Sequence, residues 1–327
     1  MTSHGAMTSD EAADAPERSF VVSRPGGDLR VHDLSGPQAD ESAPLIVLVH
    51  GITGNGRAWL TAARALARTP AIARSRIWAP DLRGRAQSRE LPGPYGLDAH
   101  VADLEAVLDH AGVQRCVLVG HSMGGFITAL AGVTIPDRLL GEVLVDGGPA
   151  FPAPEDLDVD AALQTVIGPA MTRLTMRFAD SQAYLQFWQQ HPAVGPALNS
   201  PAGADVAAYL LADLVPAQDG SGEWISSCIL EAIRADGRGV LTAATTHAAP
   251  RQAAEAGMPI EFIWAERGLM NESLGLYDDD RVAALDLPEE IHVTAVGDVN
   301  HYSILFEPAG IAAIGAGIER VLAAPAR

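Results

Sequence analysis

Short apolar runs alternate with segments of helical periodicity along much of the chain. The runs "PLIVLVHG", "CVLVGHS", "GEVLVDGG", "PIEFIWAERG" and "EIHVTAVGDVNH" have the length of strands and are mainly apolar. Between the earlier ones, "RAWLTAARALA" and "LDAHVADLEAVLDHAG" have helical spacing, and the second ends at Gly112. Before them, two β-type runs around a Pro-Gly-Gly turn indicate an N-terminal hairpin. Apolar strands separated by helices predict an α/β protein with a mostly parallel sheet covered on both faces.

This alternation is interrupted after Asp146 and resumes at Ile260. The sequence between them has helical spacing and no run that is typical of a strand. We therefore expect a helical cap inserted into an α/β core, preceded by a polar, acidic and disordered tail. The expected division is residues 1–18 for the tail, 19–149 and 251–327 for the core, and 150–250 for the cap.

Composition narrows the possible partners. Forty-one acidic and 22 basic residues give a formal net charge of −19, which argues against nucleic acid and against an anionic membrane surface. The first 18 residues have no apolar signal region and no window has 18 consecutive apolar residues, so we expect a cytoplasmic protein without a membrane span. The only cysteines are Cys116 and Cys228, which implies no disulfide framework. A small molecule is the expected partner, and the sequence does not indicate the oligomeric state.

The stretch "GHSMGG" carries the strongest chemical signal. It fits the pattern G-x-S-x-G, with Gly120 and Gly124 around Ser122, at the end of a predicted strand and the start of an apolar helix. In this setting a sharp turn can present the serine hydroxyl above the sheet. Ser122 is therefore the predicted nucleophile.

A serine nucleophile needs a base and donors for the oxyanion. His301 follows the last predicted strand on a loop, where it could reach over the carboxyl edge of the sheet. One oxyanion donor is expected from the N–H of Met123, and the other from the glycine-rich loop "HGITGNG" at Ile52. The two common glycine-rich phosphate-binding patterns do not occur, and no metal or other cofactor is expected.

These motifs together resemble the α/β-hydrolase superfamily. "HGITGNGRAW", "DLRGRAQS", "GHSMGG", "VLVDGG" and "GDVNH" follow one another in the family's order from residue 19 to the C-terminus. The resemblance implies eight strands, a helical cap after the sixth, and the same nucleophile, base and oxyanion donors.

The third member of the expected triad departs from the family pattern. By resemblance an aspartate should stand near position 268, but that residue is Gly268. Two other carboxylates are well placed: Asp146 at the end of "GEVLVD", which we favour, and Glu266 two residues before the vacant position. Asp298 is a third and more distant candidate. The sequence leaves the choice open.

The expected function is that of a serine esterase, which cleaves small to medium hydrophobic carboxylic esters through an acyl-enzyme. The neighbours of Ser122 disfavour other subclasses that the family contains, and the serine itself argues against the aspartate-dependent epoxide hydrolases and dehalogenases. Lactone or carbon–carbon bond hydrolysis remains an alternative, as does a small-molecule receptor with little turnover. Aromatic and sulfur-containing side chains of the cap could line the substrate pocket, or they could only pack the cap onto the core. The expected pocket residues are His50, Gly51, Trp59, His121, Phe151, Met176, Phe187 and Trp188.

Overall fold

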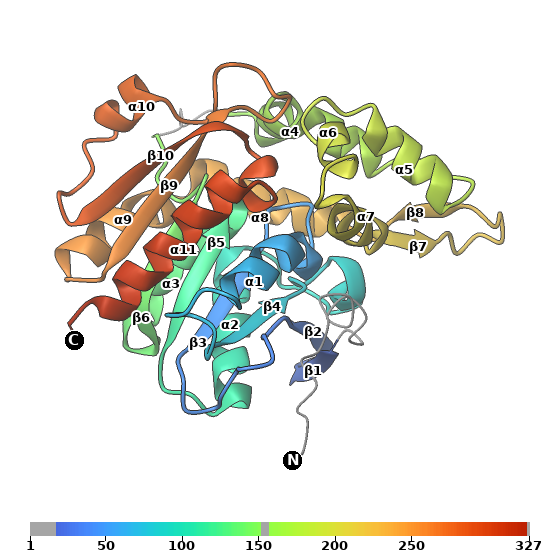
Figure 1. The fold of residues 1–327 in the computed structure, drawn as a ribbon. Helices are drawn as coiled ribbons and strands as arrows, with labels where there is room; N and C mark the ends of the chain where they lie inside the picture. The colour runs from blue at the N-terminus through green and yellow to red at the C-terminus, as the bar shows by residue number, and fades with distance from the viewer. Residues whose placement is uncertain (1–17, 152–156, 326–327) are drawn as a thin grey trace, which may run out of the picture.

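The computed structural model describes residues 18–151 and 157–325, and residues 1–17 of the expected tail lie outside this part. An eight-stranded sheet runs through the molecule in the order β1-β2-β4-β3-β5-β6-β9-β10 (Figure 1). The hairpin β1–β2 is antiparallel and so is the pair β2–β4, whereas every pair from β4 to β10 is parallel. This confirms the α/β class and the mostly parallel eight-stranded sheet. The strands are β1 (Arg18–Arg24), β2 (Gly27–Asp33), β3 (Leu45–Val49), β4 (Arg76–Pro80), β5 (Cys116–His121), β6 (Leu139–Val145), β9 (Ile260–Arg267) and β10 (Ile291–Asn300).

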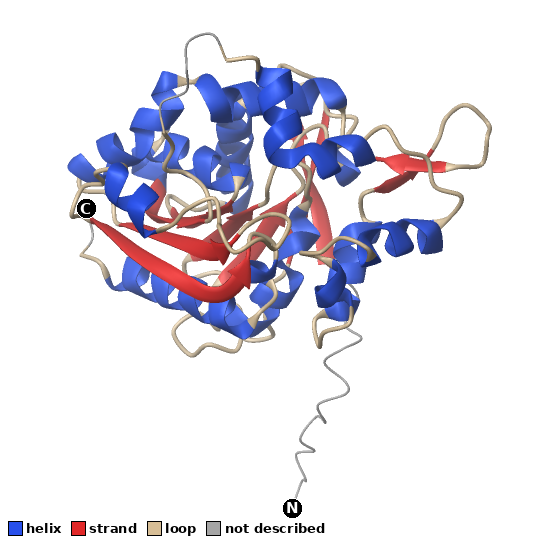
Figure 2. Cartoon of the chain, turned by 90° about the horizontal axis from the view of Figure 1, so that it is seen from above, coloured by secondary structure: helices blue, strands red, loops and turns tan. Residues whose placement is uncertain are grey.

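Helices cover both faces of this sheet (Figure 2). Strand β3 is buried throughout because its side chains alternate between two apolar layers. Val47 and Val49 pack in the layer that includes α2, α3 and α9, whereas Ile46 and Leu48 pack in the layer that includes α1 and α11. The helices of the core are α1 (Leu60–Leu66), α2 (Leu97–Ala111), α3 (Met123–Thr134), α9 (Ala244–Glu255), α10 (Asp279–Ala284) and α11 (Pro308–Ala323).

The elements between β6 and α9 form an inserted segment. Although β6 and β9 are neighbours in the sheet, the chain between them makes a long excursion beyond the strand ends (Figure 1). α9, which packs on α3, crosses the expected cap boundary at residue 250. The inserted segment contains α4 (Val159–Arg173), α5 (Ser181–Gln189), α6 (Gly195–Leu198), α7 (Gly203–Leu211), β7 (Leu214–Pro216), β8 (Trp224–Ser226) and α8 (Leu230–Thr242).

The strands β7 and β8 correct the expectation that this segment holds no strand. They pair antiparallel and lie away from the main sheet (Figures 1 and 2). Each is only three residues long, so the period-2 pattern by which a strand is read from sequence has no room to appear. Within the described residues, we find no helix that has both the length and the apolar character to cross a membrane.

Candidate active site

Ser122 occupies a strained turn between β5 and α3. Its backbone has φ 55° and ψ −124°, a conformation that residues with a side chain rarely adopt. The neighbouring glycines make room for the turn. A Cβ atom on Gly120 would lie 2.0 Å from the carbonyl oxygen of Gly124, and one on Gly147 would lie 2.2 Å from the carbonyl oxygen of Ser122. The glycine spacing seen in the sequence thus reflects close backbone contacts around the serine.

The structure brings His301 and Asp146 together. The Nδ1 atom of His301 lies 2.6 Å from Oδ2 of Asp146, and both side chains are buried. The other carboxylate oxygen, Oδ1, accepts a hydrogen bond of 3.0 Å from the backbone N–H of Ala265 on β9. Asp146 follows β6 with φ 46°, so the chain turns sharply where the carboxylate leaves the strand. With Nδ1 donating to a carboxylate, the other ring nitrogen of His301 remains for proton transfer.

Glu266, the alternative acid, has a different partner. Its Oε2 atom accepts a hydrogen bond of 2.8 Å from the backbone N–H of Asp298, and the residue is exposed. Asp298 is also exposed and has φ 59° in the bend of β10. Neither carboxylate forms a hydrogen bond or ion pair with His301 among the described residues.

The expected oxyanion donors lie on both sides of Ser122. Met123 is the first residue of α3, and Ile52 lies in the turn after β3. Among the described residues, neither backbone N–H donates to a backbone carbonyl outside the helices and strands. Gly51 lets this turn approach the serine, since a Cβ there would lie only 3.1 Å from the Cβ of Ser122.

Two buried arginines hold the carbonyl groups of this turn. The Nε of Arg85 donates to the carbonyl of Ile52 at 3.0 Å, and Nη2 of Arg173 donates to the carbonyl of Thr53 at 3.3 Å. Arg85 comes from the core, whereas Arg173 comes from α4 of the inserted segment. We did not predict either contact. The motif "DLRGRAQS" held a signal for the contact of Arg85, because it places this second arginine two residues after Arg83.

Both arginines are neutralised by carboxylates of the inserted segment. Arg85 pairs at 2.5 Å with Asp236 of α8, and both side chains are fully buried. His100 also lies 3.0 Å from this carboxylate. Burial opposes the ionised form of Asp236, but Arg85 and His100 outweigh it and lower the pKa of the carboxyl below its ordinary value. Arg173 pairs with Asp213 and donates to the hydroxyl of Tyr184 at 2.8 Å.

Two further histidines near Ser122 are buried. Burial lowers the pKa of His50 to about 3, and burial together with the nearby His301 lowers the pKa of His121 well below its ordinary value. The Nδ1 of His50 donates to the carbonyl of Gly51 at 2.8 Å, and its Nε2 accepts from the N–H of Leu82 at 2.9 Å. The Nε2 of His121 donates to the carbonyl of His301 at 2.7 Å. These rings are neutral and support the backbone around the site.

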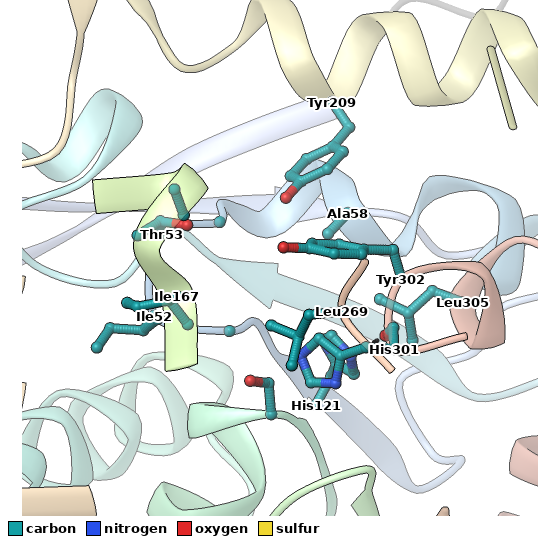
Figure 3. A pocket seen from close by; sticks show the side chains of 14 residues that line it. Ile52, Thr53, Ala58, His121, Ile167, Tyr209, Leu269, His301, Tyr302 and Leu305 are labelled. Atoms are coloured by element: carbon teal, nitrogen blue, oxygen red, sulfur yellow. Dashed lines mark hydrogen bonds between the residues drawn. The ribbon is translucent and has the colours of Figure 1, made fainter. Parts of the chain in front are cut away.

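Two cavities meet at Ser122. The smaller has a volume of about 40 Å³, and its wall includes His301 together with the side chains shown in Figure 3. The larger has a volume of about 310 Å³ and extends beneath α4 and α8. Ile52, Ser122 and Ile167 belong to both walls. Ile167 lies where α4 has a non-helical kink, with φ −124° and ψ 30°.

Three of the expected pocket residues line these cavities: Gly51 and His121 the smaller, and Phe151 the larger. The other five do not. His50 holds backbone groups, as described above, and Trp59 is fully buried with its ring edge-on to His121. Phe187 and Trp188 pack against Phe178 and Tyr184, and Met176 lies against the same apolar cluster. The apolar face of α5 therefore packs inward, which corrects its assignment to the pocket.

Several residues that line the cavities were not predicted from the sequence. Ile167 and Ala170 come from α4, Tyr209 from α7, and Leu269 and Tyr302 from the loops after β9 and β10. They come from separate elements, so no local motif connects them. Among the described residues, no group of three or more His, Cys, Asp or Glu side chains is arranged to hold a metal ion.

Comparison with known sequences places these motifs in context. The sequence model of the family described as α/β hydrolase fold matches residues 44–197. The chain is 34% identical to Lipase LipV of Mycobacterium tuberculosis over an aligned segment of 145 residues. This segment covers 43% of this chain and 53% of that protein. It is 31% identical to Epoxide hydrolase 4 of Mus musculus over an aligned segment of 129 residues, and this segment covers 38% of this chain and 33% of that protein. The matches thus span about a third to about half of the length of these relatives.

Comparison with solved structures extends over almost the whole chain. The crystal structure of E-2-(acetamidomethylene)succinate hydrolase superposes with a TM-score of 0.71 at 20% sequence identity. The superposition covers 94% of this chain and 100% of that one. At 20% sequence identity, this similarity concerns the fold alone.

Proposed function

Because the chain belongs to the superfamily of proteins with the α/β-hydrolase fold, we propose that it is a serine hydrolase of small to medium hydrophobic carboxylic esters. The observation that supports this most is the pair formed by His301 and Asp146, 2.6 Å apart, beside a cavity that Ser122 also lines. The name of the relative Lipase LipV points to the same chemistry. Ser122, in place of an aspartate, argues against the reaction named in Epoxide hydrolase 4.

The proposed reaction is acyl transfer in two steps. His301 takes the proton of the Ser122 hydroxyl through its free ring nitrogen, and the serine oxygen bonds to the ester carbon. The N–H groups of Ile52 and Met123 receive the oxyanion, where one such donor is worth about 3 kcal/mol in the transition state. His301 then protonates the departing alcohol as the carbon–oxygen bond breaks. Water, deprotonated by the same histidine, attacks the acyl carbon. The bond from this carbon to the serine oxygen then breaks, His301 returns the proton to Ser122, and the acid leaves.

In this proposal Asp146 holds the ring of His301 in the required tautomer and stabilises its positive charge. The inserted segment acts as a cap, since α4 and α7 contribute Ile167, Ala170 and Tyr209 to the wall of the smaller cavity. The occupant is a small molecule. Hydrolysis of a lactone would use the same groups.

Covalent labelling tests the serine mechanism without knowledge of the substrate. The protein is treated with an alkyl fluorophosphonate, and the adduct is located by intact mass and peptide mapping. We expect one adduct on Ser122 and none on the Ser122→Ala variant. Hydrolysis of methyl esters from acetate to decanoate, followed by acid release at constant pH, then tests turnover. Labelling without turnover of any ester would favour the receptor alternative over the esterase.

A further inference from the structure

The two cavities that meet at Ser122 differ in volume, and each can hold one of the two parts of an ester. The carbonyl carbon must lie beside the serine oxygen and the N–H groups of Ile52 and Met123. Ser122 and Ile52 belong to the walls of both cavities, so the reacting carbon lies where the cavities meet. One cavity therefore receives the acyl group and the other the alcohol.

The position of His301 decides which cavity receives which part. The histidine must give its proton to the leaving oxygen, so the alcohol lies on the side of its ring. His301 lines the smaller cavity and does not line the larger one. Resting on the serine esterase function proposed above, we infer that the smaller cavity holds the leaving alcohol and the larger cavity holds the acyl group.

The volumes and linings of the cavities define the substrate class. A cavity of about 40 Å³ holds roughly three water-sized groups, at 10–15 Å³ of such volume for each. The larger cavity, of about 310 Å³, falls within the range of roughly 300–1,000 Å³ typical of small-molecule pockets. Its wall is mainly apolar, including Phe126, Leu163, Val240 and Leu276, and contains no Arg among the described residues. Of its titratable groups, Asp146 contacts His301, and Nε2 of His247 lies 2.8 Å from the carbonyl of Val240. The substrate is an uncharged apolar acyl group joined to a very short alcohol.

Two phenols give the smaller cavity a polar side. The side chains of Tyr209, from α7, and of Tyr302, from the loop after β10, reach this cavity with their hydroxyl groups (Figure 3). Among the described residues, Tyr209 accepts a side-chain hydrogen bond only through its backbone carbonyl and Tyr302 donates one only through its backbone N–H, so neither hydroxyl is taken up by a protein group. Burial raises the pKa of Tyr302 to about 12 and also raises the pKa of Tyr209, so both are neutral and able to donate. We therefore expect the protein to prefer an ester whose short alcohol carries a hydrogen-bonding group over one with a methyl group in the same place.

Two isomeric esters test the orientation. Methyl octanoate and heptyl acetate have the same composition but place the long chain on opposite sides of the carbonyl. We expect kcat/KM for methyl octanoate to be higher by about tenfold or more, since a single methylene that does not fit can cost this much. Equal rates, or faster cleavage of heptyl acetate, would overturn the orientation while leaving the esterase intact. If neither ester is cleaved and Ser122 is not labelled by the fluorophosphonate, the proposed function itself fails.

Two substitutions test the cavities separately. Val240→Phe fills the larger cavity and should lower kcat/KM for methyl octanoate more than for methyl butanoate. Leu269→Ala enlarges the smaller cavity and should raise kcat/KM for butyl octanoate relative to methyl octanoate. Each variant serves as the control for the other, because the structure places the two side chains in different cavities. If Val240→Phe changed the preference for the alcohol and Leu269→Ala changed the preference for the acyl chain, the acyl group and the alcohol would have to exchange cavities.

The phenols are tested with a pair of esters of equal size. 2-Hydroxyethyl octanoate and propyl octanoate differ by a hydroxyl in place of a methyl group. The wild type should favour the hydroxyethyl ester, and Tyr302→Phe should reduce that ratio without changing the preference for methyl octanoate over heptyl acetate. An unchanged ratio in Tyr302→Phe and in Tyr209→Phe would exclude a polar contact with the alcohol.

Discussion

The imidazole of His301 and the carboxylate of Asp146 lie 2.6 Å apart although 155 positions separate them in the chain. The two residues follow β10 and β6, which are separated in the sheet by β9. The carboxylate reaches across because its other oxygen is held by the N–H of Ala265 on that intervening strand. The carboxylate that contacts the histidine thus comes from the earlier of the two candidate strands.

Asp146→Asn should therefore lower kcat by several orders of magnitude with little change in fold. An amide can donate to the histidine and so favours the wrong tautomer, an effect of about 10⁴ in a well-studied serine protease. Ester hydrolysis and circular dichroism are the measurements.

Glu266→Gln is the matched control for Asp146→Asn. Among the described residues, its carboxylate accepts only from the N–H of Asp298, so kcat should stay within about threefold of the wild type. A large loss of activity in this variant, with Asp146→Asn active, would exchange the roles of the two acids.

Gly147→Ala should prevent the turn at Ser122 from closing. The added Cβ would lie 2.2 Å from the carbonyl oxygen of Ser122, and that backbone atom cannot move without opening the turn. We expect loss of activity and a lower Tm. Gly315→Ala, on α11, is the control because its Cβ would be 3.4 Å from a side chain of Leu66. There the helix should gain up to about 1 kcal/mol of stability.

Arg85 is expected to act on catalysis through Ile52. Arg85→Met removes the donor that holds the Ile52 carbonyl and leaves the buried Asp236 with only His100 and the N–H of Gly96 as partners among the described residues, which should cost up to about 3–5 kcal/mol of folding stability. The double variant Arg85→Met/Asp236→Asn removes both charges, keeps an oxygen that can accept from the N–H of Gly96, and should regain part of that stability.

The kinetics of this double variant separate positioning from stability. If Arg85 positions the oxyanion donor, kcat should stay low in the double variant while KM changes little. Recovery of kcat together with Tm would assign the arginine a structural role alone.

The buried histidines predict a fall in stability in mild acid. The folded-state pKa of His50, about 3, lies below its ordinary value of 6.5, and that of His121 is also lowered. As pH falls from 6.5 toward 3, the unfolded chain binds protons that the folded chain does not. The free energy of unfolding should then fall by up to about 1.4 kcal/mol per pH unit for each histidine.

Urea unfolding at several pH values measures this slope. His50→Gln should flatten it, because glutamine offers an N–H and an oxygen but does not titrate. His110→Gln is the control, since that residue is exposed on α2, where its ring stacks on Phe20. An unchanged slope in His50→Gln would mean that other groups cause the loss in acid.

The sequence indicated the sheet, the strained serine and the histidine because each depends on a local pattern. Ser122 has its glycines within a few residues, and His301 follows a recognisable strand. The choice of acid could not be made in this way. Asp146 and Glu266 both stand near the carboxyl ends of neighbouring strands, and only the backbone turn at Asp146, with φ 46°, directs that carboxylate toward the histidine.

The lining of the cavities was harder to predict for a similar reason. Phe187 and Trp188 stand three and four positions after Tyr184, which is the spacing of one helix face, but periodicity does not say what that face contacts. In the structure they pack against Phe178 and Tyr184. Tyr209 and Tyr302, which do line a cavity, are single residues on elements far apart in the chain, and only the folded topology brings them together.

The ion pairs of Arg85 with Asp236 and of Arg173 with Asp213 also bear on how this protein could be re-engineered. Exchange of the inserted segment for that of a relative is an obvious way to change specificity. Here such a chimera would discard both carboxylates and leave Arg85 of the core as an uncompensated charge beneath the turn that carries Ile52. A functional graft must therefore carry an acidic residue at the position of Asp236, or replace Arg85 at the same time. The segment is a separate insertion in topology, but it is not an interchangeable module.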